Sequence, residues 1–208
     1  MYKNYNKKII DFIASLILII LLSPLFILAI ILLFIANQGK PFFFQQRPGK
    51  NGKTFTIIKL KTMNNKKDSK GNLLPDEKRL TKVGVFIRKT SLDEIPQLIN
   101  VIKGEMSLIG PRPLVIKYLP FYTEKERLRH AVRPGITGLA QVSGRNNLKW
   151  DERLALDADY VENLSFKQDV KILYNTVLKV IASENIITNP QSIMEDLDEE
   201  RKNRNTTI

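Results

Sequence analysis

The stretch that decides the fold runs from Thr90 to Pro113 and reads TSLDEIPQLINVIKGEMSLIGPRP. It opens with two adjacent carboxylates, Asp93 and Glu94, and continues with apolar residues at helical spacing up to Ile102. The chain then turns through Gly110-Pro111-Arg112-Pro113, where the two prolines fix φ and hold Arg112 on a stiff loop. The stretch therefore predicts a short helix that begins with an acidic pair and ends before a rigid arginine loop.

The acidic pair has two interpretations. Ser91-x-x-Glu94 has the form of a capping box, and acidic residues in a first helical turn favour the macrodipole. Pro96 fits this interpretation if Asp93 is the N-cap, because the first turn needs no backbone donor at that position. The alternative is that Asp93 and Glu94 are catalytic, and the pair alone does not decide between them.

The N-terminal segment from Phe12 to Ile35 carries no charge and is long enough to span a bilayer core of about 30 Å. Ser23-Pro24 interrupts it, and Pro24 leaves the carbonyl of Ile20 without its helical donor, for which the Ser23 hydroxyl is the nearest replacement. A kinked spanning helix is one interpretation. Because lysines and arginines flank the segment on both sides and favour the cytoplasm, we favour a re-entrant hairpin that returns to the same face.

The amino-acid composition limits the kinds of catalytic chemistry and partners that this chain can have. The 208 residues carry a formal net charge of +12, which suggests anionic partners such as nucleic acid, anionic lipid or phosphorylated substrates. Cysteine is absent and His130 is the only histidine, which excludes thiolate chemistry and disfavours His-rich zinc sites and a Ser-His-Asp triad. His130 lies in a basic run, Lys125 to Arg133, that is typical of a solvated face. Carboxylates and hard cations remain as catalytic tools.

Secondary structure outside this stretch follows from periodicity and turn signals. Phe42–Phe44 and Thr54–Leu60 flank Asn51-Gly52 and predict a β-hairpin. Trp150–Asn163 and Ser165–Ala182 predict two helices, the second with an apolar stripe that either packs in the core or lies on a membrane surface. The residues after Ser183 are polar and predict a disordered tail or a loose helix.

A second motif block, VRPGITGLAQVSGRN, runs from Val132 to Asn146. Its glycines predict a tight loop whose backbone can approach a ligand, and Gln141 adds hydrogen-bonding groups after it. Because a guanidinium forms a rigid fork that suits diphosphate, Arg112, Arg133 and Arg145 form the expected phosphate-binding set.

These two blocks together resemble the bacterial sugar transferases, and more narrowly the small monotopic phosphoglycosyl transferases. The resemblance extends from the N-terminal apolar segment to about Phe166, and it implies a UDP-sugar donor, a polyprenol (undecaprenyl) phosphate acceptor and Mg²⁺. By matched position it implies that Asp93 is the nucleophile and that Glu94 assists through the metal or as a base. Lys59 becomes a candidate contact for the donor phosphates, and Arg88 is a further candidate, with an ion pair to the acidic pair as its structural alternative.

The expected fold is α+β and mainly helical, with the membrane hairpin, a small β-hairpin and amphipathic surface helices around one cytoplasmic catalytic domain. The expected divisions are residues 1–36 for the membrane segment, 37–182 for the catalytic domain and 183–208 for the tail. The expected location is the cytoplasmic face of a bacterial inner membrane, with no nucleic-acid partner. Two other classes stay open: a noncatalytic lipid-binding scaffold and a membrane-tethered nucleic-acid binder.

Overall fold

The computed structural model describes residues 2–144, 148–182 and 196–206. Its helices and strands confirm a mainly helical α+β fold. The helices are α1 (Lys7–Ala36), α2 (Asp76–Arg79), α3 (Lys82–Lys89), α4 (Gln97–Ile102), α5 (Glu124–Arg127), α6 (Leu139–Ser143), α7 (Trp150–Glu162), α8 (Phe166–Ile181) and α9 (Leu197–Thr206). The strands are β1 (Phe42–Pro48), β2 (Thr54–Leu60), β3 (Ser107–Ile109) and β4 (Gly135–Thr137).

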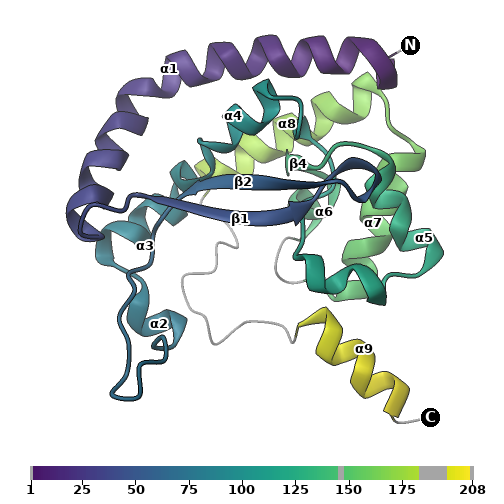
Figure 1. Cartoon of the computed structure of the whole chain (residues 1–208). Coiled ribbons are helices and arrows are strands. Elements are labelled where there is room, and N and C mark those ends of the chain that lie inside the picture. The colour runs from purple at the N-terminus through teal and green to yellow at the C-terminus, as the bar shows by residue number, and fades with distance from the viewer. Residues whose placement is uncertain (1, 145–147, 183–195, 207–208) are drawn as a thin grey trace.

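Helix α1 is one continuous helix that bends along its length. In Figure 1 it runs along the top of the molecule and then turns down the left side. Pro24 lies inside it, and the Ser23 hydroxyl donates to the carbonyl oxygen of Ile20 at 2.7 Å, as the sequence predicted. By length and composition α1 could cross a membrane, and most of its apolar side chains are exposed.

Both ends of α1 contact the rest of the chain. Near its N-terminus, Lys7 pairs with Asp169 of α8 at 2.6 Å. Near its C-terminus, Ala29 and Leu33 pack in a buried cluster with Leu60 of β2 and Ile87 of α3. The helix is therefore fixed to the same folded body at both ends, with the Ser23-Pro24 step between them.

The predicted hairpin is confirmed. Strands β1 and β2 pair antiparallel in one register from Phe42 opposite Leu60 to Pro48 opposite Thr54. The turn places Asn51 at φ 55° and Gly52 at φ 75°, the left-handed conformations that this residue pair favours. One face of β2 is buried through Phe55 and Ile57, which join Val101 of α4 and Met106 in the core.

A second, two-stranded sheet was not anticipated. Strand β3 follows the acidic-pair stretch and pairs parallel with β4, so that Ser107 lies opposite Gly135. A Cβ atom on Gly135 or Gly138 would collide with the backbone of Gly110. The glycines of the second motif block therefore permit two chain segments to cross closely, a role that the sequence did not predict.

Helix α8 exposes its predicted apolar stripe, so that the core-packing interpretation is wrong. The members of this stripe are between 46% and 77% exposed (Phe166, Val170, Leu173, Val177 and Ile181). Burial occurs on the other side of the helix, through Ile172 and Asp169. Phe86 of α3 is also largely exposed, at 60%. A molecule with this much exposed apolar side-chain surface on α1 and α8 is suited to contact with lipid.

The C-terminal helix α9 is ordered in the described residues and docks on the domain. Leu197 is fully buried in a cluster with Tyr118, Trp150 and Leu154. Arg201 pairs with Glu126 of α5 and with Asp151 of α7 at 2.7 Å. The prediction of a disordered tail or loose helix is therefore wrong for Leu197–Thr206, and residues 183–195, to which it also applied, lie outside the described residues.

Candidate active site

The acidic pair lies in a short 3-10 turn, Leu92–Glu94, between α3 and α4. Ser91 precedes it in the left-handed conformation, at φ 55°, and makes no side-chain cap. Helix α4 begins only at Gln97, and Pro96 is its N-cap residue. Both capping interpretations are therefore wrong: neither Ser91 nor Asp93 caps α4, and the two carboxylates are free for another role.

Glu94 is held by two cations. Its Oε1 accepts from Lys59 Nζ of β2 and from Arg112 Nη2, each at 2.7 Å. Burial alone would raise the pKa of Glu94, but the charge and hydrogen bonds of Arg112 and Lys59 outweigh it and lower that pKa well below the ordinary range. Glu94 thus remains a carboxylate at any pH near neutrality. It fixes Lys59 and Arg112, two residues that the sequence predicted, in one place.

Asp93 differs from its neighbour. It is half-buried, and its carboxylate forms no hydrogen bond or ion pair with any residue in the described ranges. Burial and the negative charge of Glu94 raise the pKa of Asp93 to about 6, against the opposing charges of Lys59, Arg88 and Arg112. Asp93 precedes α4 instead of lying in its first turn, so it does not have the position in which a helix macrodipole favours a carboxylate. We call Lys59, Asp93, Glu94 and Arg112 the acidic-pair cluster.

Arg88 lies beside this cluster without an ion pair to either carboxylate in the described part of the chain. Its Nε donates to the hydroxyl of Thr62 at 2.8 Å, and it lines the same cleft as Asp93. The structural alternative for Arg88, an ion pair with Asp93 or Glu94, is therefore wrong. Arg88 therefore adds a cation to the lining of the cleft that contains Asp93.

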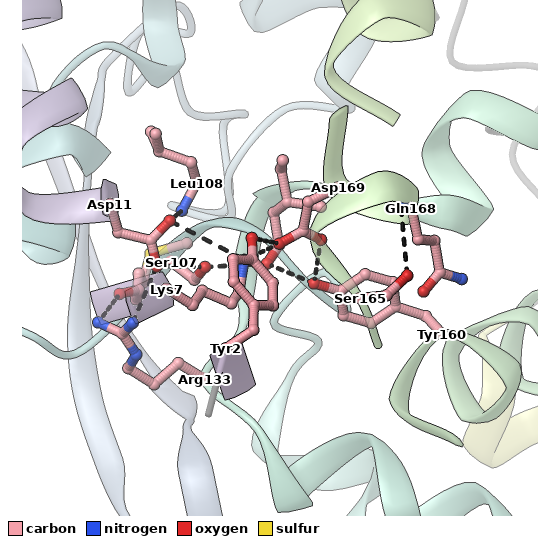
Figure 2. A network of polar contacts seen from close by, with 12 residues as sticks. Tyr2, Lys7, Asp11, Ser107, Leu108, Arg133, Tyr160, Ser165, Gln168 and Asp169 are labelled. Carbon is pink, nitrogen blue, oxygen red and sulfur yellow. Dashed lines mark hydrogen bonds and ion pairs between the residues drawn. The ribbon is translucent and has the colours of Figure 1, made fainter. Parts of the chain in front are cut away.

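Arg133 is not part of this site. Its guanidinium donates to Asp11 Oδ2 of α1 at 2.8 Å and to the carbonyl oxygen of Met106 at 3.1 Å, and its side chain is 12% exposed. Figure 2 shows the buried polar network to which this pair belongs. We call this network the anchor cluster; it contains Tyr2, Lys7, Asp11, Ser107, Arg133, Tyr160 and Asp169. The assignment of Arg133 to phosphate binding is therefore corrected: it joins α1 to the domain.

Gln141 lines the cleft with Asp93, and both polar atoms of its side-chain amide are buried without a partner in the described residues. Buried polar groups are ordinarily satisfied, so this amide is a candidate for contact with a ligand. Arg145, the third predicted phosphate-binding arginine, lies outside the described residues.

Sequence reasoning missed a buried pair behind Arg112. Arg129 donates to the carbonyl oxygen of Arg112 at 2.6 Å and to Asp157 Oδ2 at 2.9 Å, and both members of the pair are buried. The run from Lys125 to Arg133 was interpreted as a solvated face, which is wrong for Arg129 and for half-buried His130. Burial and the charge of Arg129 lower the pKa of His130 to about 4. The sequence signal for burial of the Arg129–Asp157 pair was the spacing of the apolar residues of α7 on either side of Asp157, and that signal is weak.

These residues open onto one large cleft with a volume of about 1510 Å³. Lys59, Arg88 and Arg112 supply positive charge beside Asp93 and Glu94. In the described residues no group of three or more His, Cys, Asp or Glu side chains is placed to hold a metal ion. The arrangement suits a phosphate ligand, which cations neutralise and which an unpaired carboxylate can attack.

Comparison with known proteins defines the class. The model of the bacterial sugar transferase family matches residues 2–183, and the chain belongs to this family. It is an enzyme of the phosphoglycosyl transferase type. Helix α9 lies beyond the matched residues.

Individual relatives are consistent with this class. The chain is 54% identical over 183 residues to an uncharacterized sugar transferase named EpsL from Bacillus subtilis, covering 86% of this chain and 89% of that protein. It is 36% identical over 197 residues to the UDP-glucose:undecaprenyl-phosphate glucose-1-phosphate transferase of Caulobacter vibrioides, covering 88% and 72% of the two chains. It is 38% identical over 196 residues to the undecaprenyl-phosphate galactose phosphotransferase of Salmonella typhimurium, covering 86% of this chain but 41% of that longer protein.

Proposed function

We propose that this enzyme transfers a phosphosugar from a UDP-sugar to polyprenol phosphate, specifically undecaprenyl phosphate, and releases UMP. The product, a polyprenol diphosphate sugar, would begin the assembly of a glycan such as a capsule, exopolysaccharide, O-antigen or glycoprotein glycan. The observation that carries the proposal is the difference within the acidic pair. Glu94 is fixed by Lys59 and Arg112, whereas Asp93 lies in the same cleft and pairs with no side chain among the residues that the structure describes. The names of the Caulobacter and Salmonella relatives support the substrate class.

In the first step Asp93 is the nucleophile. One carboxylate oxygen forms a bond to the β-phosphorus of the donor, while the bond from that phosphorus to the bridging oxygen breaks and UMP leaves with the electron pair. A pKa of about 6 leaves Asp93 mostly ionised at neutral pH. Lys59 and Arg112, which are already fixed, neutralise the charge that repels the carboxylate from a diphosphate.

In the second step an oxygen of polyprenol phosphate attacks the same phosphorus, and the bond to Asp93 breaks and regenerates the carboxylate. The depressed pKa of Glu94 makes it a poor base. We therefore propose that Glu94 supplies negative charge and positions the neighbouring cations, including a metal ion, and that it does not deprotonate the acceptor. Glu94→Gln should slow both steps, because Lys59 and Arg112 would no longer be held in place.

Magnesium fits this proposal as a ligand carried with the donor. Mg²⁺ is commonly bound by one or two carboxylates together with substrate phosphates, and Asp93 and Glu94 supply such a pair. When bound, the ion would supply charge that bridges phosphate oxygens. Glu94 Oε1 is already engaged by two cations, so Asp93 and the second oxygen of Glu94 would be its protein ligands.

We further propose that α1 enters and leaves the cytoplasmic face of a bacterial inner membrane. Contacts of both helix ends with one domain, and the Ser23-Pro24 step between them, support this topology. The chain has no cysteine, so that a cysteine introduced at exposed Tyr5 is a unique probe. It should resist an impermeant thiol reagent in intact cells, and labelling equal to that of a periplasmic control would refute the re-entrant topology.

The central experiment supplies labelled donor and magnesium without acceptor. The wild type should retain phosphosugar on the peptide containing Asp93 and should exchange labelled UMP into UDP-sugar, as ping-pong kinetics require. Asp93→Asn should lose labelling, exchange and turnover by orders of magnitude. Asp159→Asn, a change of the same chemistry on the exposed face of α7, should retain all three. Exchange that strictly requires acceptor would instead indicate direct transfer in a ternary complex.

A further inference from the structure

Helix α9 lies beyond the residues that the family model matches, so the family assigns it no role. Figure 1 shows it at the lower right, below α7 and away from α1. Leu197, its first residue, is fully buried and packs with Tyr118 and with Trp150 and Leu154 of α7. Burial of a whole leucine side chain fixes α9 against both of these parts of the chain.

Ion pairs extend this docking to the same two parts of the chain. Lys117, in the 3-10 helix Ile116–Phe121, pairs with Asp196 at 2.6 Å. Arg201 of α9 pairs with Asp151 of α7 at 2.7 Å. Helix α9 therefore joins the 3-10 helix to α7, two segments that are far apart in the sequence.

Both segments support Arg112 of the acidic-pair cluster. The 3-10 helix begins shortly after Arg112 in the chain. Helix α7 carries Asp157, which pairs with Arg129, and Arg129 donates to the carbonyl oxygen of Arg112 at 2.6 Å. The guanidinium of Arg112 in turn donates to Glu94, the neighbour of Asp93. The two segments that α9 joins are therefore the ones that hold the backbone of Arg112.

Helix α7 also forms part of the cleft wall beside Arg112. Arg153 and Asp157 of α7 line the cleft together with Arg112. The guanidinium of Arg153 lies over the ring of Trp150, at 4.8 Å from its centre. Since Leu197 packs in the same cluster as Trp150, a single side chain separates α9 from the lining of the cleft.

We infer that α9 is a positioning element for Arg112, and that it acts through the 3-10 helix and α7 without touching the substrate. The inference rests on the proposed function, because it takes Arg112 as a cation that neutralises the donor phosphates. A misplacement of about 1 Å that originates far from the chemistry can lower a rate about 100-fold. A helix that fixes both supports of Arg112 therefore sets the rate of the first step.

The test is a double-mutant cycle in the full-length enzyme. Leu197→Asp places a charge at a fully buried position and should release α9, whereas Arg112→Lys removes the fork that α9 positions. The changes are made singly and together, and each protein is assayed for UMP exchange without acceptor and for its unfolding midpoint. Trp150 is the only tryptophan in the chain, so its fluorescence reports the release of α9.

We expect Leu197→Asp to lower UMP exchange per folded molecule roughly 10- to 100-fold. In the Arg112→Lys background the same change should cost at most about twofold, because no fork is left to position. In an Arg88→Lys background it should again cost its full amount, since Arg88 is held by Thr62. Two controls should keep wild-type exchange: the conservative Leu197→Met, and Glu199→Gln at an exposed position of α9.

If Leu197→Asp does not fold, Arg201→Gln takes its place in the same cycle, because it removes the two ion pairs with Glu126 and Asp151 but keeps Leu197. Equal losses in the wild-type and Arg112→Lys backgrounds would overturn the inference and leave α9 with a purely stabilising role. Full exchange in a folded variant whose fluorescence shows that α9 is released would overturn it as well. Absence of UMP exchange from the wild type would instead refute the proposed two-step reaction, so the two failures are distinguishable.

Discussion

The anchor cluster and the acidic-pair cluster contain similar charged residues but satisfy them differently. In the anchor cluster, Asp169 accepts from Lys7, Tyr2 and Tyr160, and Asp11 accepts from Ser107, Arg133 and the backbone of Leu108. Both carboxylates there are 4% exposed. In the acidic-pair cluster, Glu94 is satisfied and Arg112 is 43% exposed. Asp93 has no hydrogen-bond or ion-pair partner in the described part of the chain. A fully paired buried network fixes a structure, whereas an unpaired carboxylate beside an accessible guanidinium can react.

The largest expected effect comes from Lys7→Met in the anchor cluster. The change leaves two buried carboxylates with less positive charge, and breaking a buried ion pair in this way costs about 3–5 kcal/mol. We expect a large fall in the thermal unfolding midpoint in nanodiscs, with UMP exchange per folded molecule maintained. Lys59→Met in the acidic-pair cluster should lose exchange but cost less stability than Lys7→Met, because Glu94 keeps its ion pair with Arg112. A fully stable but inactive Lys7→Met variant would contradict the division between the clusters.

The next prediction compares Arg112 with Arg133, since the sequence motifs predicted the same phosphate-binding role for both. Arg112→Lys keeps a charge but loses the bidentate fork, so turnover should fall about 10- to 100-fold, as expected when a charged hydrogen bond of about 1.5–3 kcal/mol is lost. Its unfolding midpoint should change little, because the side chain is partly exposed.

Arg133→Lys should show the opposite pattern, with a lower unfolding midpoint and unchanged turnover per folded molecule. It is buried against Asp11 and the carbonyl of Met106, and a lysine cannot reach both as a fork does. Loss of turnover at full stability in Arg133→Lys would restore the assignment of this residue to substrate binding.

The sequence predicted what depends on short-range pattern. The hairpin followed from Asn51-Gly52 between two β-rich runs, and its boundaries at Thr54 and Leu60 are confirmed. The hydrogen bond from Ser23 to Ile20 followed from the missing donor of Pro24. Lys59, Glu94 and Arg112 do meet, although only the family motif, and no periodicity, brought the three together.

What the sequence could not supply was the partner of each polar residue across the fold. Arg133 and Asp11 are 122 residues apart in the chain, and Arg129 and Asp157 are 28 apart. No local pattern distinguishes an arginine that faces solvent from one that meets a buried carboxylate. The same holds for Leu197, whose polar surroundings suggested disorder although it docks on Trp150 and Tyr118.

The smallest expected effect is a change in the stability of Asp93→Asn, which tests the difference between Asp93 and Glu94 directly. Because the native pKa of Asp93 is raised from 3.8 to about 6, the native state binds this proton more tightly than the unfolded state. Asp93 therefore makes its full contribution to the free energy of unfolding below about pH 4, and this contribution is lost as the pH rises through about 6. At pH 7.5 the ionised Asp93 opposes folding, and asparagine, which keeps the shape of the side chain, removes that penalty.

Asp93→Asn should therefore unfold at a higher temperature than the wild type at pH 7.5, by an amount on the order of 1–3 kcal/mol, since one pKa unit corresponds to about 1.4 kcal/mol. The difference should vanish near pH 4. Glu94→Gln should behave in the opposite way and lose stability at pH 7.5, because the lowered pKa of Glu94 reports favourable contacts with Lys59 and Arg112. Thermal scans across this pH range measure both variants. If Asp93→Asn were no more stable than the wild type at pH 7.5, Asp93 would have a favourable partner of its own, and the contrast between a satisfied glutamate and an unsatisfied nucleophile would fail.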